Sequence, residues 1–92
     1  MSNEVFENVW DAIADTPEEA ANLTVRANLM HKIIAIIREN GWKQVEAAQR
    51  LGVSQPRVND LLHGRITDFS LDALVNMAAM LGRRVRIELE AA

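Results

Sequence analysis

The 92-residue sequence contains no cysteine, which excludes disulfide bonds and zinc sites built on thiolates. It also lacks an unbroken run of about eighteen apolar residues, the length that a membrane-spanning helix needs. The first ten residues, MSNEVFENVW, are acidic and lack the basic start and apolar stretch of a secretory signal. These absences predict one compact domain that works in the cytoplasm and does not enter a membrane.

Catalytic motifs are also missing from the sequence. His31 and His63 are the only histidines, and neither a glycine-rich phosphate loop nor an HExxH metal motif is present. His31 lies among apolar residues of a predicted helix, where we expect a partly buried structural role. We therefore expect no enzymatic activity, no catalytic residue, no metal site and no cofactor.

The net charge of −3 is unevenly distributed along the chain. Residues 1–22 carry six acids and no base, whereas residues 23–69 carry seven bases and four acids. Residues 70–92 carry three of each. Because the basic excess coincides with the pattern described next, it suits a surface that contacts DNA phosphates.

Residues 41–65 contain the pattern of two short helices joined by a tight turn. Three apolar residues at helical spacing predict the first helix: Val45, Ala48 and Leu51. A second apolar stripe predicts the other helix: Val58, Leu61 and Leu62. Between them, Gly52 suits a helix C-terminus, and Ser54 is a favourable N-cap for the second helix.

Polar residues of the second predicted helix lie off its apolar stripe and should face a partner. Arginine suits the O6 and N7 atoms of guanine, and glutamine or asparagine suits the N6 and N7 atoms of adenine, in a DNA major groove. We expect four residues to read bases: Ser54, Gln55, Arg57 and Asn59. The alternative for Arg57 is an ordinary solvated arginine.

This region resembles a known family of DNA-binding proteins. The pattern is Gln44, Ala48, Leu51-Gly52-Val53-Ser54-Gln55, Val58, Leu61 and Gly64. It resembles the helix-turn-helix of the phage-repressor-like (Xre, Cro/repressor) family. The longer string QPRVNDLLHGRITDFSLDALVNMAAMLG resembles the HigA-type antitoxin branch. The resemblance covers roughly residues 20–90, and it implies an all-α, lambda-repressor-like bundle of about five helices.

The resemblance also implies roles for individual residues. It implies that Gln44, at the start of the first helix, contacts a phosphate. It implies that Gln55 contacts a base. Lys43, His63 and Arg65 are further expected phosphate contacts. Lys43 stands where the family usually has a serine or threonine cap, which weakens the cap by on the order of 1 kcal/mol. The alternative for His63 is a plain surface residue.

Three further helices are predicted around the helix-turn-helix at residues 44–62. Residues 5–14 have the spacing of a short amphipathic helix, within an acidic arm at residues 1–15 that packs on its own domain, on another protein or on a second protomer. Thr16, Pro17 and Glu19 form a helix start signal, and the apolar stripe that follows predicts a helix over residues 17–39. The loop at residues 66–69 is expected to point Ile66 and Phe69 inward. Ser70 is expected to cap a last helix over residues 71–81, with Met77 and Met80 off its apolar stripe. This helix completes a DNA-binding domain at residues 16–82.

The C-terminal residues 83–92 have the alternation of a β-strand. Val85, Ile87 and Leu89 lie on one face, and charged residues lie on the other. A lone strand leaves its backbone groups unpaired, so the same strand of a second molecule is the expected partner. The alternative is a tail folded on its own domain.

Two functions remain open from the sequence. One is a transcriptional repressor that binds a palindromic site in double-stranded DNA as a homodimer, with recognition helices about 34 Å apart. The other adds a protein partner, because the resemblance implies an antitoxin that binds a RelE/HigB-like ribonuclease toxin. The acidic arm with its two aromatic residues would complement a basic ribonuclease. A stand-alone regulator, or a module that mainly binds protein, would share the same helix-turn-helix.

Overall fold

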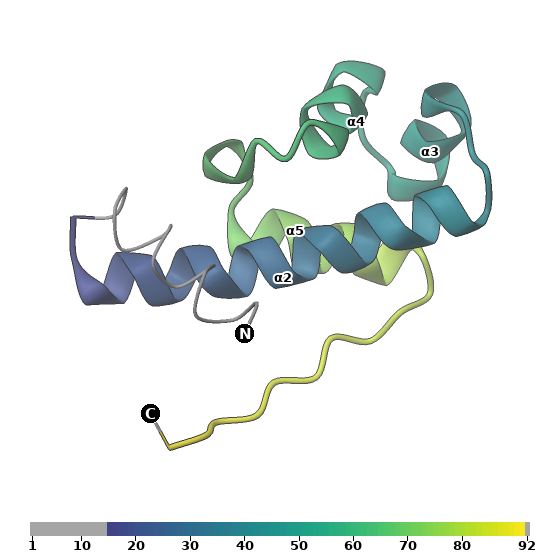
Figure 1. Cartoon of the computed structure of the whole chain (residues 1–92). Coiled ribbons are helices and arrows are strands. Elements are labelled where there is room, and N and C mark those ends of the chain that lie inside the picture. Colours follow the sequence, from purple (N-terminus) through teal and green to yellow (C-terminus); the bar gives the residue numbers. More distant parts are fainter. Residues whose placement is uncertain (1–14, 92) are drawn as a thin grey trace.

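A computed structural model describes residues 15–91 of the chain. This part contains four α-helices, a short 3₁₀ helix and no strand (Figure 1). With the labels of Figure 1, the elements are α2 (Pro17–Glu39), α3 (Gln44–Leu51), α4 (Gln55–Leu62), η1 (Ile66–Asp68) and α5 (Leu71–Met80). The predicted helical helix-turn-helix bundle is confirmed for these residues. The remaining predicted helix, at residues 5–14, lies outside the described residues.

Helix α2 begins at the predicted start signal. The Thr16 hydroxyl accepts a hydrogen bond of 3.1 Å from the Glu19 N–H, and Pro17 occupies the first helical position. The Glu19 carboxylate in turn accepts a bond of 3.3 Å from the Asp15 N–H, which satisfies a donor just outside the helix. The predicted stripe along α2 is buried throughout: Leu23, Ala27, Met30, Ile34 and Ile37.

Helices α2 and α5 pack side by side, and α3 and α4 pack on each other on one side of α2 (Figure 1). The core lies where these two pairs meet. Its largest fully buried side chains come from every described element or from the loop beside it: Leu23, Met30, Ile33, Leu51, Val58, Leu61, Phe69 and Leu74. The pair α2 and α5 is therefore the platform that holds the helix-turn-helix.

The structure corrects the predicted inner faces of two helices. Val45 is 56% exposed, and Ala47 is buried beside Ala48 and Leu51 instead. These three residues form one face because they are spaced i, i+1 and i+4. On α5, Met77 is buried rather than off the stripe, since α5 packs against both α2 and α3 and buries a face that includes this position.

His31 and the end of α5 also differ from expectation. His31 is exposed on α2 rather than partly buried. Helix α5 ends at Met80, one residue early, and Leu81 is its C-cap.

The expected strand at residues 83–92 is not formed in the described chain. The tail leaves α5 and runs beyond the helices (Figure 1). Val85 is half-buried against the core, whereas Ile87 is 71% exposed and Leu89 is 97% exposed. A strand needs a second strand to bond with, and the described residues of a single chain supply none.

Candidate nucleic-acid interface

The turn between α3 and α4 fixes the angle of the two helices. Gly52 has a φ of +70°, the left-handed conformation that glycine adopts at little cost. A Cβ added there would lie 3.2 Å from the Met80 Cε, so α5 also approaches this turn closely. The Val53 N–H donates 3.1 Å to the Ala48 carbonyl, and the Val53 side chain packs against the core. The turn therefore joins the helix-turn-helix to the platform.

The first turn of α4 projects away from the core. Ser54, Gln55 and Pro56 are all exposed. The Ser54 hydroxyl accepts a hydrogen bond of 3.3 Å from the Arg57 N–H, so this predicted base-reading group acts as the helix cap. The Gln55 side chain makes no hydrogen bond to the described residues, which leaves its amide available to a partner. Of the four predicted base readers, Gln55 is the one best placed to reach outward.

Gln44 and Asn59 lie together across the two helices. The Gln44 Nε2 donates to the Asn59 Oδ1 over 3.5 Å, and both residues are half-buried. A contact of this length is weak, so the two amides are aligned without being locked. The structure thus brings a predicted phosphate contact of α3 next to a predicted base reader of α4.

Arg57 bonds within the chain rather than extending freely into solvent. Its Nη1 donates 2.9 Å to the Asp68 carbonyl, and its guanidinium carbon lies 4.0 Å from the centre of the Phe69 ring. The buried Phe69 ring and the turn at η1 therefore hold the Arg57 side chain against the segment that follows α4. This arrangement makes Arg57 a brace between the recognition helix and the turn that follows it.

A second arginine, from α2 rather than α4, bonds to the same turn. The Arg26 Nη1, on α2, donates 3.0 Å to the Phe69 carbonyl, while its Nε is buried without a hydrogen-bond partner. Sequence reasoning missed this contact because 43 residues separate its partners and no local pattern links them. The inward position expected for Phe69 was the one available signal.

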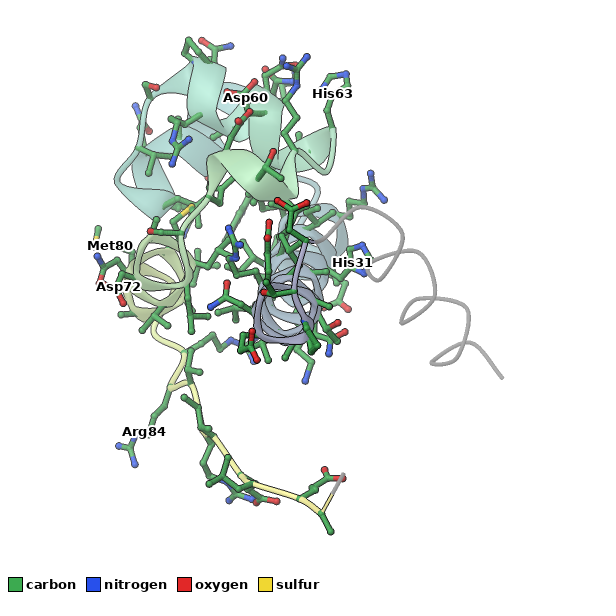
Figure 2. The ribbon with its side chains drawn as sticks, turned by 90° about the vertical axis from the view of Figure 1, so that its left-hand side faces the viewer. His31, Asp60, His63, Asp72, Met80 and Arg84 are labelled. Atoms are coloured by element: carbon green, nitrogen blue, oxygen red, sulfur yellow. The ribbon has the colours of Figure 1, made fainter. Side chains whose placement is uncertain are left out.

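The predicted phosphate contacts lie at both ends of the helix-turn-helix. Lys43 is the exposed N-cap residue of α3 and makes no side-chain cap bond. His63 ends α4, with its Nδ1 2.8 Å from the Asn59 carbonyl. Because a carbonyl can only accept, we place a proton on Nδ1. Figure 2 shows His63 at the end of the molecule formed by α3 and α4, far from Arg84 on the tail.

Arg65 is partly engaged by a neighbouring acid. Its Nε lies 3.7 Å from the Asp60 Oδ1, and the arginine side chain is 59% exposed. An exposed pair at this distance is weak and screened by salt, so it does not hold the guanidinium away from a phosphate. Lys43, His63 and Arg65, which were predicted to contact phosphate, are thus all exposed on the helix-turn-helix side of the molecule.

A protein-family model described as a helix-turn-helix domain matches residues 12–90. The chain belongs to this helix-turn-helix domain family. The match covers most of the chain and supports the resemblance to Xre-like regulators and to DNA-binding proteins in general. No curated protein matches the sequence. The narrower HigA-type resemblance stays a prediction.

The described residues of this helix-turn-helix domain offer neither a metal site nor a membrane-spanning helix. Within residues 15–91, no group of three or more histidine, aspartate or glutamate side chains is arranged to hold a metal ion. None of the helices in this part is long and apolar enough to cross a membrane. The exposed face of α4 and the start of α3 are therefore the strongest candidate site.

Proposed function

We propose that the protein is a sequence-specific transcriptional repressor that binds double-stranded DNA in the cytoplasm. The observation that carries the proposal is the exposed leading turn of α4, which presents Gln55 beside the aligned amides of Gln44 and Asn59. In a helix-turn-helix protein, the residues at this end of the recognition helix contact base edges in the major groove. Lys43, His63 and Arg65 flank this turn as phosphate contacts.

The proposed repressor acts as a homodimer on a palindromic operator. Two copies related by a two-fold axis would present two recognition helices to half-sites about one helical turn apart, roughly 34 Å. The C-terminal tail supports this assembly, because Ile87 and Leu89 are exposed apolar residues on a segment with the alternation of a strand. Single exposed apolar residues are common, but two on one face of an unpaired segment favour an interface.

A titration against DNA tests the proposal. The full chain is titrated with DNA from its own upstream region and with unrelated DNA, at roughly 50 and 200 mM salt. We expect the upstream fragment to bind at least about 10³-fold tighter, with a steep dependence on salt. Equal and weak binding to both fragments would contradict sequence-specific repression.

Variants of the exposed glutamines locate the reading residues. Gln55→Ala should weaken binding to the preferred site by about 1–3 kcal/mol and relax the preference at one or two base pairs. Gln49→Ala is the matched control, because Gln49 is an exposed glutamine on α3 that no prediction places at the DNA. If both variants lost the same affinity on every sequence, Gln55 would not read bases.

We further propose that the regulator is the antitoxin of a toxin–antitoxin pair, in the HigA-type branch. The supporting observation is the charge distribution, with six acids and no base in residues 1–22. A segment of this charge complements a basic ribonuclease of the RelE/HigB kind. The alternative is a stand-alone regulator of the same fold.

The two alternatives differ in the genes beside this one and in what the protein binds. An antitoxin requires an adjacent short reading frame for a basic ribonuclease, whose product should co-purify with the full chain. The control exchanges Glu4, Glu7 and Asp11 for glutamine and asparagine, which should weaken that complex and leave DNA binding unchanged. Without such a neighbour, or with a neighbour that does not bind, the antitoxin proposal fails and the repressor proposal stands.

A further inference from the structure

We propose that two tails pair as antiparallel strands in one register, with Ile87 facing Ile87 of the second copy on the two-fold axis. The proposal rests on the homodimer proposed above and specifies its interface. It places Val85 opposite Leu89 and Arg86 opposite Glu88, each pair occurring twice. Unpaired backbone, charge pattern and exposed apolar surface each support this arrangement.

The backbone of the tail is available for pairing. The Arg83 N–H donates 3.0 Å to the Ala78 carbonyl and closes the end of α5. Beyond this bond, the N–H and C=O groups of residues 84–91 make no hydrogen bond to the described part of the chain. A row of such groups beside alternating apolar residues is the edge at which another strand adds.

The charges of the tail select one register among those that keep apolar residues facing each other. With Ile87 on the axis, Arg86 faces Glu88 and Arg84 faces Glu90, so every cross-strand charge pair is attractive. Moving the axis by one residue along the strand places Arg86 opposite Arg86 or Glu88 opposite Glu88, which is repulsive. Moving the axis to the midpoint between two neighbouring residues places charged side chains opposite apolar ones.

The same charged residues already meet within one tail. The Arg86 Nη2 lies 2.8 Å from the Glu88 Oε1, and the two side chains are 84% and 68% exposed. Residues two apart in a strand share a face, so this contact shows that Arg86 and Glu88 point the same way. Because the pair is exposed, it is weak, and little stability is lost when the pair across the ladder replaces it.

The apolar face of such a ladder has a place to pack. A groove of about 440 Å³ lies between α2, α5 and the tail. Its apolar lining comes from α2, α5 and the tail itself: Val25, Leu29, Ile36, Val75, Val85 and Ile87. The partner's Leu89, placed beside Val85, would extend this lining across the groove. That position would cover a side chain that is 97% exposed in the single chain.

Single cysteine variants test the register, because the chain has no cysteine of its own. Facing residues of an antiparallel pair have Cα atoms about 4.5–5.5 Å apart, within the range of about 4.4–6.8 Å that disulfides span. Diagonal neighbours are about 7–8 Å apart and fall outside it. Ile87→Cys, Val85→Cys and Leu89→Cys leave every charge in place, so the variants do not bias the register.

Two samples should form disulfide-linked dimers fastest under a mild oxidant: Ile87→Cys alone, and the mixture of Val85→Cys with Leu89→Cys. We expect their linkage to be at least about tenfold faster than that of the two control mixtures. The control mixtures are Val85→Cys with Ile87→Cys, and Ile87→Cys with Leu89→Cys. In each mixture, mass spectrometry measures the dimer that links the two different variants. Faster linkage in either of those would overturn the register and support a shifted ladder. No linkage in any variant would overturn strand pairing.

A charge exchange tests the register without a covalent link. Glu88→Arg should raise the dissociation constant of the dimer about five- to tenfold, because two attractive pairs become repulsive. Adding Arg86→Glu restores opposite charges in the proposed register and should recover affinity to within about twofold. Failure of the second change to rescue the first would overturn the register.

Sedimentation of the unmodified chain separates the two proposals. A dimer that persists in solution while Ile87→Cys does not link means that the register is wrong and the homodimer stands. A monomer at every concentration, with no linkage, means that the homodimer itself is wrong.

Discussion

The helix-turn-helix and the C-terminal tail both carry clear apolar patterns, but they bury them differently. In α3 and α4, one apolar face of each helix is buried, with Ala47, Leu51, Val58 and Leu61, and Val45 is the exception. In the tail, only Val85 packs on the core, while Ile87 and Leu89 are exposed. The backbone follows the same division, since the helices bond within themselves and residues 84–91 bond to nothing else in the described chain.

The difference follows from how each element satisfies its backbone. A helix closes its hydrogen bonds within a continuous segment, so caps and one apolar face suffice to place it. A strand bonds only to another strand, and its exposed face stays unpaired until a partner arrives. The helix-turn-helix is therefore complete in one chain, whereas the backbone of residues 84–91 stays unpaired there.

The largest effect should come from removing the ring beneath Arg57. Phe69→Ala deletes a fully buried side chain that also supports the brace from α4, and it should destabilise the domain by about 3–5 kcal/mol. Ile87→Ala, an equal kind of change in the tail, should cost less than about 0.5 kcal/mol in the monomer. Urea unfolding at low protein concentration measures both. Similar losses would remove the contrast between the two regions.

Deletion of residues 83–92 tests whether the helical domain folds without the tail and whether the tail links two domains. The shortened chain should keep its helical content and melt as a folded domain, because its core lies in residues 20–78. It should lose at least about 10²-fold affinity for an operator with two half-sites, since the two domains are no longer linked. Affinity for a single half-site should not change. A shortened chain that still sediments as a dimer would refute the role of the tail.

A smaller effect is expected from the Arg57 brace. Arg57→Gln removes the contacts to Asp68 and Phe69 and should destabilise the domain by about 1–2 kcal/mol. The matched control is Arg50→Gln, because Arg50 also lies over an aromatic ring, that of Trp42, at 4.6 Å. Its side chain is 52% exposed and its ion pair with Glu46 is a surface pair, so it should cost less than about 1 kcal/mol.

The DNA preference of the same variant separates a brace from a base reader. A brace holds α4 at its angle, so Arg57→Gln should weaken contacts along the whole site. Loss of preference at a single base pair with unchanged stability would show that Arg57 leaves Phe69 and reads a base.

The smallest effect is expected at the start of α3. Lys43 caps this helix without a side-chain bond, so Lys43→Ser should stabilise the domain by about 0.5–1 kcal/mol. If Lys43 contacts a phosphate, the same change should lower the salt slope of DNA binding by about 1. Stability and binding should thus move in opposite directions. An unchanged salt slope would remove Lys43 from the DNA interface.

Much of the fold could be predicted because its signals are local. The bounds of α2 follow from the cap at Thr16 and the glycine at 41, and those of α3 and α4 follow from Gly52 and Ser54. The rotation of a helix is harder to predict, since it depends on neighbours far along the chain. Val45 and Met77 were placed on the wrong faces for that reason.

The candidate site divides in the same way. The polar leading turn of α4 could be predicted, because Ser54 caps the helix and Gln55 falls off its apolar face. The contacts of Arg57 could not, since they depend on the Phe69 ring and the Asp68 carbonyl, which a separate turn brings into reach. A residue type suited to reading guanine was thus found packed against its own chain.

The sequence by itself determined where α2, α3 and α4 begin and end, which segment forms the helix-turn-helix, and that the tail alternates like a strand. Those properties depend on capping, glycine and periodicity over a few residues. Only the tertiary structure decided which faces are buried and that the tail remains unpaired in a single chain. It also decided that Arg26 and Arg57, from two helices, donate hydrogen bonds to carbonyls of one turn. Those outcomes depend on which distant segments meet in space, and no local pattern encodes that.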